Sequence, residues 1–235
     1  ASELGEAPEV PRSLYEERLL RIERKMTEKG IDALVIFGDK EHFGNIKFCS
    51  GFDPRFEEAL LIVTCENRPM LLVGDEGVSY CKGTLKIDCD TGLWPPLSLM
   101  GMPREKLKTF GQLLREAGIR AGMRVGTVGW KYFTSFEFED SALAIEIPLY
   151  AVDELRKIVG ADNIVNATDI FMNPAEGLRS CLDIHEIAVA EYAGTLVSDC
   201  VNRMIEKLDP GMSEYDAIRL MKLNGYPLST HVMLM

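Results

Sequence analysis

The chain has 235 residues, of which 46% are hydrophobic and 27% are charged, a composition typical of a globular protein with one or two domains. Its net charge of −11 argues against a nucleic acid or an anionic membrane as partner, because no surplus of lysine and arginine is present to meet phosphate groups. No apolar run is long enough to cross a membrane.

The N-terminus and the cysteines indicate a cytoplasmic protein. Residues 1–11 are polar and acidic and include two prolines, unlike the apolar centre of a signal peptide. The six cysteines form no Cys-x-x-Cys pair, and several lie in apolar runs. Buried, reduced thiols fit this pattern best, and such thiols are typical of the cytoplasm.

Helices and apolar strands alternate through the first half of the chain, which indicates an α/β fold. An apolar stripe at helical spacing predicts a helix over residues 11–29, which Gly30 ends. Short apolar runs predict strands over residues 31–37, 58–64, 70–74 and 85–89, and short helices are predicted over 39–48 and 75–80. A turn between the second and third strands makes them an antiparallel hairpin.

The second half continues this alternation, with longer irregular stretches. Pro95 and Pro96 predict that residues 92–102 have no regular structure. The remaining elements are a helix predicted over 103–118, a strand over 123–128, an extended segment over 145–149, a short helix over 152–159 and a last strand over 163–167. The chain contains no internal repeat.

A long helix followed by a second helix is predicted near the C-terminus. Asp183 and Glu186 have the spacing of a capping box, and apolar residues then recur every three or four positions. Asp209-Pro210-Gly211 ends this helix, because proline cannot continue it and glycine tolerates the turn. Ser213 and Asp216 repeat the capping-box spacing at the start of the next helix.

This C-terminal segment resembles the opening of the "pita-bread" metallohydrolase domain of the creatinase and Xaa-Pro peptidase family. Arg179, the pair Glu186-Ile187 and the turn Pro210-Gly211-Met212-Ser213-Glu214 match the family in order and in distance. Leu182-Asp183-Ile184 stands where the family has a Lys-Ser-Pro-like cap, and aspartate caps a helix as serine does.

The preceding residues resemble the N-terminal α/β domain of the same family. In that domain a helix ends at glycine, a strand of the Asp-Ala-Leu-Val-Ile kind follows, and a Tyr-x-x-Gly-Phe-like loop precedes a hairpin. Gly30, residues 32–36 and Phe48-Cys49-Ser50-Gly51-Phe52 correspond to these features, with Phe48 in place of the usual tyrosine. Residues 124–130 correspond to a late strand of the same domain.

The resemblance covers residues 12–235 and implies a domain organisation. After a flexible arm at residues 1–11, residues 12–172 would form the creatinase-type N-terminal domain, an α/β fold with a mixed sheet flanked by helices. Residues 173–235 would form the truncated start of the α+β pita-bread catalytic domain.

The resemblance also implies metal-dependent hydrolysis. Members of the family hold two divalent metal ions (Mn, Co or Zn) with two aspartates, one histidine and two glutamates, and the metals activate a water that attacks an amide beside proline. The spacing of the family's first two aspartate ligands does not occur in this chain. We therefore expect the catalytic and metal-binding residues to follow Met235 in a longer natural protein, so that this chain itself binds no metal.

Three residues are candidates for contact with substrate. In creatinase-like dimers the segment after the Gly-Phe loop reaches the active site of the partner subunit, and residues 53–57 are that segment here. Arg55 and Phe56 offer a partner for a carboxylate and an apolar wall. A solvated arginine beside a core phenylalanine is the alternative interpretation. His231, on the last predicted strand, is the third candidate, although the functional histidine of the family follows that strand.

Three functions remain open. In the first, the chain is the N-terminal part of an aminopeptidase P or prolidase, a homodimer in which this domain holds the dimer and shapes the pocket for a proline-containing peptide. In the second, the same fold is a creatinase-like amidinohydrolase that hydrolyses creatine or another small amidine or amide. In the third, the chain is a non-catalytic binding or assembly module.

Other common sites are not supported by the sequence. Gly122, Gly126 and Gly129 lack the spacing of a dinucleotide-binding loop. The chain has no Gly-x-Ser-x-Gly motif of a serine hydrolase and no cysteine–histidine cluster with zinc spacing.

Overall fold

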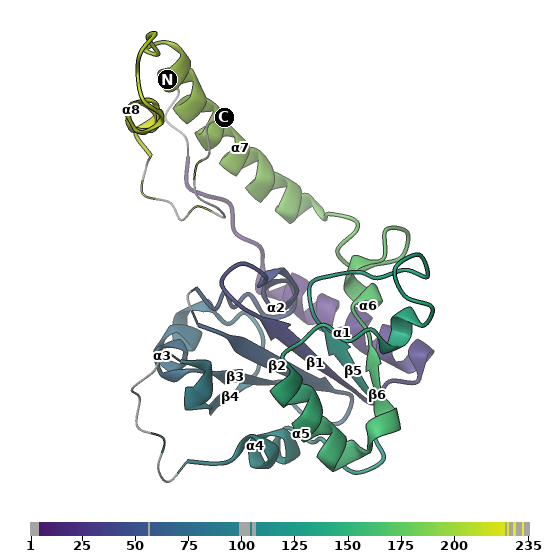
Figure 1. Cartoon of the computed structure of the whole chain (residues 1–235). Coiled ribbons are helices and arrows are strands. Elements are labelled where there is room, and N and C mark those ends of the chain that lie inside the picture. Colours follow the sequence, from purple (N-terminus) through teal and green to yellow (C-terminus); the bar gives the residue numbers. More distant parts are fainter. Residues whose placement is uncertain are drawn as a thin grey trace. The chain divides into compact units, whose positions relative to one another are not determined.

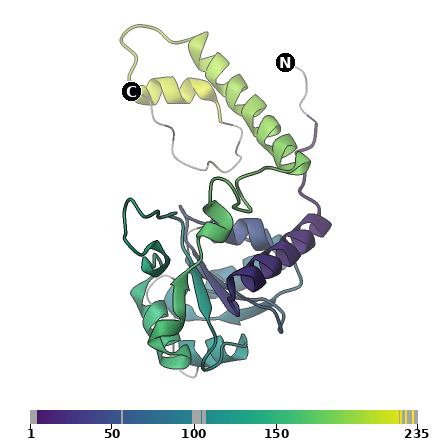
Figure 2. The same cartoon turned by 90° about the vertical axis from the view of Figure 1, so that its right-hand side faces the viewer.

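The computed structural model describes residues 5–55, 57–98, 104, 107–223, 225, 228 and 232. The chain divides into two compact units. One unit is Arg12–Cys181, and the other consists of Ala1–Pro11 together with Leu182–Met235. The first unit contains the sheet and the helices around it, which Figure 1 and Figure 2 show from two directions.

The first unit is built on a mixed sheet with the strand order β4-β3-β2-β1-β5-β6. The strands are β1 (Ala33–Gly38), β2 (Ala59–Thr64), β3 (Met70–Val73), β4 (Asp90–Leu93), β5 (Val125–Val128) and β6 (Ile164–Asn166). The central strand β1 pairs antiparallel with β2 and parallel with β5. β2 and β3 form the predicted antiparallel hairpin, whereas β4 is parallel to β3 and β6 is parallel to β5. The predicted mixed α/β fold is therefore confirmed.

Helices join the strands of this unit. They are α1 (Arg12–Lys29), α2 (Gly44–Ser50), α3 (Asp75–Thr84), α4 (Phe110–Glu116), α5 (Leu149–Val159) and α6 (Asp169–Met172), with 3-10 turns at Pro95–Leu97, Ser141–Leu143 and Ala161–Asn163. α2 ends at Gly51, which has a φ of 79° and donates its N–H to the carbonyl of Lys47. A glycine is required there because the left-handed conformation places a side chain against the backbone.

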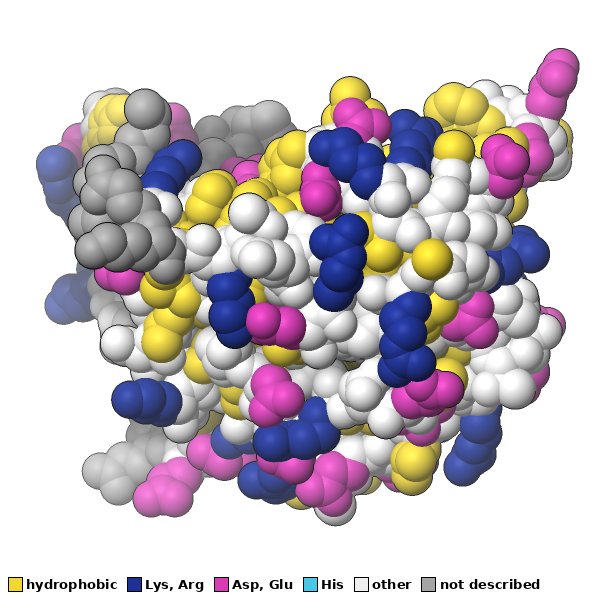
Figure 3. Space-filling view, turned by 90° about the horizontal axis from the view of Figure 1, so that it is seen from below, with side chains coloured by type: hydrophobic (Ala, Val, Ile, Leu, Met, Phe, Trp, Pro, Cys, Tyr) yellow, Lys and Arg dark blue, Asp and Glu magenta, His cyan; other side chains and the backbone are white. Residues whose placement is uncertain are grey.

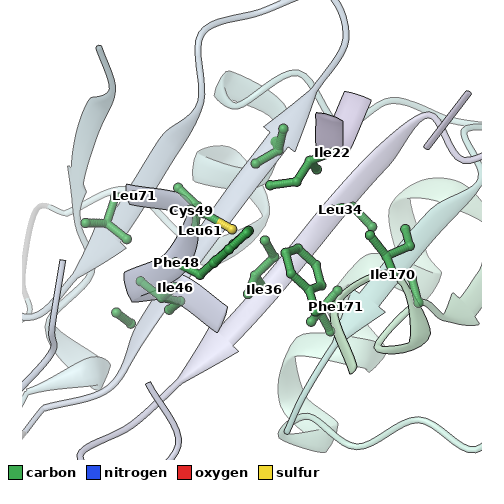
Figure 4. Packing of buried hydrophobic residues seen from close by; sticks show 14 of the residues in the cluster. Ile22, Leu34, Ile36, Ile46, Phe48, Cys49, Leu61, Leu71, Ile170 and Phe171 are labelled. Atoms are coloured by element: carbon green, nitrogen blue, oxygen red, sulfur yellow. The ribbon is translucent and has the colours of Figure 1, made fainter. Parts of the chain in front are cut away.

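Apolar side chains cover both faces of the sheet, because successive residues of a strand point to opposite sides. Leu34 and Ile36 of β1 belong to a core that α1, α2 and α6 complete, as Figure 4 shows. Phe48 and Phe171 meet edge to face there, with ring centroids 6.3 Å apart. Val35 belongs to the opposite core, which α4 and α5 complete. The sheet is therefore the middle of three layers.

The structure corrects two predictions at the edge of the sheet. The predicted strand over residues 85–89 is wrong, because the edge strand β4 begins only at Asp90 and pairs with β3 alone. Pro95 and Pro96 do not prevent regular structure either, since Pro95–Leu97 form a 3-10 turn. The fixed φ of proline suits the first positions of such a turn.

Two further predicted elements differ from those that the structure shows. α4 starts at Phe110 rather than at residue 103, because Thr109 and Gln112 form a capping box there. The segment 145–149, predicted to be extended, pairs with no strand in the described sheet, and its last residue begins α5.

The second unit contains α7 (Ile184–Ile205) and α8 (Glu214–Met221). Both predicted capping boxes are confirmed, with Asp183 and Glu186 at the start of α7 and Ser213 and Asp216 at the start of α8. The Nε of Arg203 donates to the carbonyl of Met221 at 3.0 Å and so joins the two helices.

The predicted apolar face of α7 is largely exposed in the part of this unit that the structure describes. Ile187 and Val197, which belong to that face, are exposed, and Cys200 is the one buried residue of α7. Two helices therefore bury little apolar surface by themselves.

Acidic and basic side chains alternate on the face of the molecule that Figure 3 shows. Two ion pairs lie within α5. They join Arg156 to Asp153 at 3.2 Å and Lys157 to Glu154 at 2.8 Å. Because charges of both signs are mixed on this face, it carries no broad positive field.

Candidate functional site

Asp53 and Arg55 of the predicted substrate segment lie in a turn between α2 and β2. The Oδ1 of Asp53 accepts a hydrogen bond from the N–H of Arg55 at 3.0 Å, and the Oδ2 of Asp53 lies 3.7 Å from the Nζ of Lys47. Arg55 has a φ of 63°, a left-handed conformation that is uncommon for residues other than glycine, and its side chain is exposed. The other two candidates, Phe56 and His231, lie outside the described residues.

The turn borders an open cavity of about 560 Å³ at the start of α3. The cavity is lined by Pro54, Arg55, Glu57, Glu76, Gly77, Ser79 and Tyr80. The buried Glu57 accepts a hydrogen bond at Oε2 from the N–H of Gly77 at 3.0 Å. No sequence pattern predicts this role of Glu57. Its partner Gly77 follows the whole hairpin of β2 and β3, and no periodic pattern links the two residues.

A second cluster lies at the carboxyl ends of β1 and β5. The Nδ1 of His42 is 3.0 Å from the Oδ1 of Asp39, and the ring of His42 stacks on Trp130 with centroids 3.9 Å apart. The Nζ of Lys131 lies 4.5 Å from the centre of the Trp130 ring. The Oε2 of Glu146 accepts the N–H groups of Trp130 and Lys131, both at 2.8 Å, and so holds this loop in place.

The charge of Asp39 is stabilised within this cluster. Burial disfavours its ionised form, but hydrogen bonds from the His42 side chain and from the backbone N–H groups of His42 and Glu41 outweigh burial, so the pKa of Asp39 is lowered. His42 was predicted on a short helix, yet it lies before α2 and is half-buried against Trp130. An aspartate that holds Nδ1 orients the ring and fixes its tautomer.

A tyrosine that is 42% exposed, Tyr150, lies close to the same end of the sheet. The hydroxyl of Tyr150 donates to the Oε2 of Glu58 at 3.3 Å, and the rings of Tyr150 and Trp94 lie 5.5 Å apart. Burial raises the pKa of both Glu58 and Tyr150. The hydrogen bond from Tyr150 lowers the pKa of Glu58 and so opposes the effect of burial. The negative charge of Asp39 raises the same pKa further.

Replacing Glu58 with glutamine is expected to raise the melting temperature at neutral pH. The folded pKa of Glu58 lies above its ordinary value of 4.5, so its contribution to stability is fully present below 4.5 and is lost as the pH rises through the folded pKa. Glutamine removes the charge and keeps an acceptor for Tyr150. Thermal unfolding at about pH 7 and about pH 4 tests this, with a gain expected at the higher pH only. An equal gain at both pH values would contradict it, and Glu139→Gln, at an exposed position, is the control.

Arg179, which the family resemblance singled out, supports the carboxyl ends of the strands. Its Nη1 donates to the Oδ1 of Asn45 at 2.8 Å, and the Nδ2 of Asn45 donates to the carbonyl of Gly129 at 2.7 Å. Asn45 is buried, so each of these bonds replaces one that water would otherwise make. Arg179 therefore has a structural role within the first unit.

The cysteines are unpaired, and three of them are poorly suited to act as nucleophiles. All six are free thiols. Burial raises the pKa of Cys49, and it raises the pKa of Cys81 to about 11 and that of Cys89 to about 12. These three thiols are therefore protonated at neutral pH, and the thiolate is the reactive form.

The described part of the chain brings together no three histidine, cysteine, aspartate or glutamate side chains in an arrangement that holds a metal ion. The residues present thus do not fit the two-metal centre that the family resemblance implies. Over the same residues, no helix combines the length and the apolar character needed to span a lipid bilayer.

Comparison with known proteins gives one family match. Residues 18–181 match the family model described as the Creatinase/Prolidase N-terminal domain. No curated protein matches the chain by sequence. The match spans most of the first unit and ends where that unit ends, at Cys181.

Solved structures with a similar fold are peptidases by name. The prolidase from Pyrococcus horikoshii OT3 has a TM-score of 0.61 and 19% identity, over 89% of this chain and 49% of that chain. Dipeptidase PepE from Mycobacterium ulcerans has a TM-score of 0.59 and 16% identity, over 90% and 50%. The X-Pro aminopeptidase from Thermotoga maritima MSB8 has a TM-score of 0.58 and 15% identity, over 87% and 47%. The chain therefore spans about half the length of these proteins, and at this identity the likeness shows a shared fold.

Proposed function

Because the chain belongs to the creatinase/prolidase family and carries its N-terminal domain, we propose that it is the N-terminal part of a peptidase that hydrolyses Xaa-Pro bonds. The observation that carries the proposal is the family match over residues 18–181. The similar fold of a prolidase, a dipeptidase and an X-Pro aminopeptidase supports it. The chain spans about half the length of those proteins. The peptidase activity is therefore proposed for the whole protein and not for this chain alone.

Within that protein, the proposed role of this domain is to hold a homodimer and to shape the substrate pocket. Arg55 supports this role, because its side chain is exposed while the backbone of its turn is fixed by Asp53. An exposed guanidinium suits a substrate carboxylate, which it binds with two parallel hydrogen bonds. Phe56 and His231 remain proposed contacts of the same substrate.

Two divalent metal ions (Mn, Co or Zn) are part of the proposal for the whole protein. When bound, such metals supply an activated water and a positive charge that stabilises the transition state. The described residues do not form a metal centre, so we expect the ligands in the half of the relatives' length that this chain does not span. A cytoplasmic location is also proposed, and six unpaired cysteines support a reducing compartment.

The full-length protein loaded with Mn²⁺ is expected to cleave alanyl-proline at least about 100-fold faster than alanyl-leucine, because a pocket built for the proline ring discriminates against other residues. Release of the free amino acids measures both rates. Removal of the metal with a chelator should abolish cleavage, and added Mn²⁺ should restore it.

The same assay distinguishes the other functions. Hydrolysis of creatine without cleavage of alanyl-proline would identify a small-amide hydrolase. Absence of cleavage of every substrate, with Mn²⁺, Co²⁺ and Zn²⁺ each supplied, would identify a non-catalytic module. Either result would contradict the proposed peptidase.

A further inference from the structure

Glu57 is a buried acid, and one of its two carboxyl oxygens accepts no hydrogen bond from the described residues. The residue is 6% exposed, and its Oε2 accepts the N–H of Gly77 at 3.0 Å. Its other oxygen, Oε1, is buried and has no hydrogen-bond partner anywhere in the described part of the chain. Buried polar atoms are nearly always paired, because an unpaired one has lost water without a replacement. The structure thus leaves Oε1 enclosed and without a donor.

The surroundings of Glu57 hold its carboxyl group beside a helix. It lies at the N-terminus of the ten-residue helix α3, and its Oε2 accepts the N–H of Gly77 there. Gly74 precedes the helix, and a Cβ there would lie 2.7 Å from the Oε2 of Glu57. The close approach of the carboxyl group to the helix therefore depends on a glycine at this position.

Glu57 lines the open cavity of about 560 Å³ beside α3, which we call the Glu57 cavity. Glu76, the hydroxyl-bearing Ser79 and Tyr80, and the cationic Arg55 line the same cavity. Oε1 is enclosed in the unliganded chain, and rotation about the last bond of a glutamate side chain is soft. A turn of the carboxyl group that loosens the bond from Gly77 therefore presents Oε1 to a ligand in the cavity. Two acids and two hydroxyls in one wall accept hydrogen bonds from a donor with several N–H groups.

We propose that the Glu57 cavity binds a small primary ammonium compound, whose N–H groups donate to the Oε1 of Glu57 and to Glu76. A primary ammonium carries three donors and a positive charge, and both match the carboxylates of this wall. Two kinds of molecule supply such a group. One is a simple amine, and the other is an amino acid or a peptide N-terminus, whose carboxylate or carbonyl would lie towards Arg55. The cavity shares Arg55 with the proposed substrate pocket, but its test measures binding and requires no peptidase activity.

Titration of the ¹⁵N-labelled chain with methylammonium chloride tests the proposal. The N–H of Gly77 reports directly on the site, because it donates to the same carboxyl group. We expect its amide resonance to shift and to saturate at millimolar methylammonium. Tetramethylammonium chloride is the matched control, because this ion has the same charge and no N–H donor. Glycine distinguishes the sources: tighter binding than methylammonium indicates an amino acid or peptide terminus, and equal binding indicates a simple amine.

Glu57→Gln is expected to weaken methylammonium binding at least about 10-fold. Glutamine can still accept the N–H of Gly77, while its amide nitrogen takes the place of the unused oxygen and repels a donor. Equal binding by the variant would overturn the proposal. If the variant does not fold, the wild-type titration decides. A Gly77 resonance that does not saturate, or that responds equally to tetramethylammonium, would show that Oε1 is satisfied by water only.

Discussion

Phe171→Ala is expected to lower the free energy of unfolding by about 3–5 kcal/mol, the usual cost of truncating a fully buried aromatic side chain. Phe171 is 0% exposed and lies in the core between the sheet and α1, α2 and α6. The substitution removes its edge-to-face contact with Phe48 and leaves a cavity that well-packed neighbours fill only in part.

Urea unfolding followed by far-ultraviolet circular dichroism measures this effect. The matched control is Phe136→Ala, because Phe136 is 96% exposed and lies outside both cores. That variant should remain within about 0.5 kcal/mol of the wild type. Equal losses in the two variants would contradict the packing described for the first unit.

Arg55→Ala in the full-length protein is expected to lower kcat/KM for alanyl-proline about 10- to 100-fold. Hydrogen bonds to charged groups contribute about 1.5–3 kcal/mol, and the proposed contact joins the guanidinium to the free carboxylate of the dipeptide. If the contact is made equally in the ground state and the transition state, the change appears in KM and turnover is unchanged.

Alanyl-prolinamide is the control substrate, because it lacks the carboxylate and should respond little to the variant. Arg12→Ala is the control substitution, since Arg12 is exposed and pairs with Glu16 within α1. Unaltered kinetics in Arg55→Ala would remove this residue from the substrate pocket and leave it as a solvated arginine in a surface turn.

The sequence predicted the centre of the sheet well and its edge poorly. β1, β2 and β3 are continuous apolar runs whose residues are almost all buried, so hydrophobic pattern alone locates them. β4 reads Asp-Thr-Gly-Leu, and its first two residues are exposed, so nothing in its own sequence resembles a strand. It is a strand because β3 offers it a parallel partner, which is a property of the assembled sheet.

The candidate sites depend still more on the assembled fold. Capping boxes were predicted because both partners lie within four residues of each other. The contacts of Glu57 with Gly77, of His42 with Trp130 and of Asn45 with Gly129 join loops that are remote in sequence. The order of the strands brings these loops together, and that order is not encoded in any one segment.

The position of β1 at the centre of the sheet has a consequence for synthesis on the ribosome. β1 to β4 emerge one after another and pair along one side, whereas the other side of β1 pairs with β5, as Ala33 does with Val125. A nascent chain therefore carries an entirely apolar strand with one open edge until residue 128 has left the exit tunnel. Open edges of this kind join neighbouring chains readily. During the interval between the synthesis of β4 and that of β5, the growing protein is thus exposed to such association.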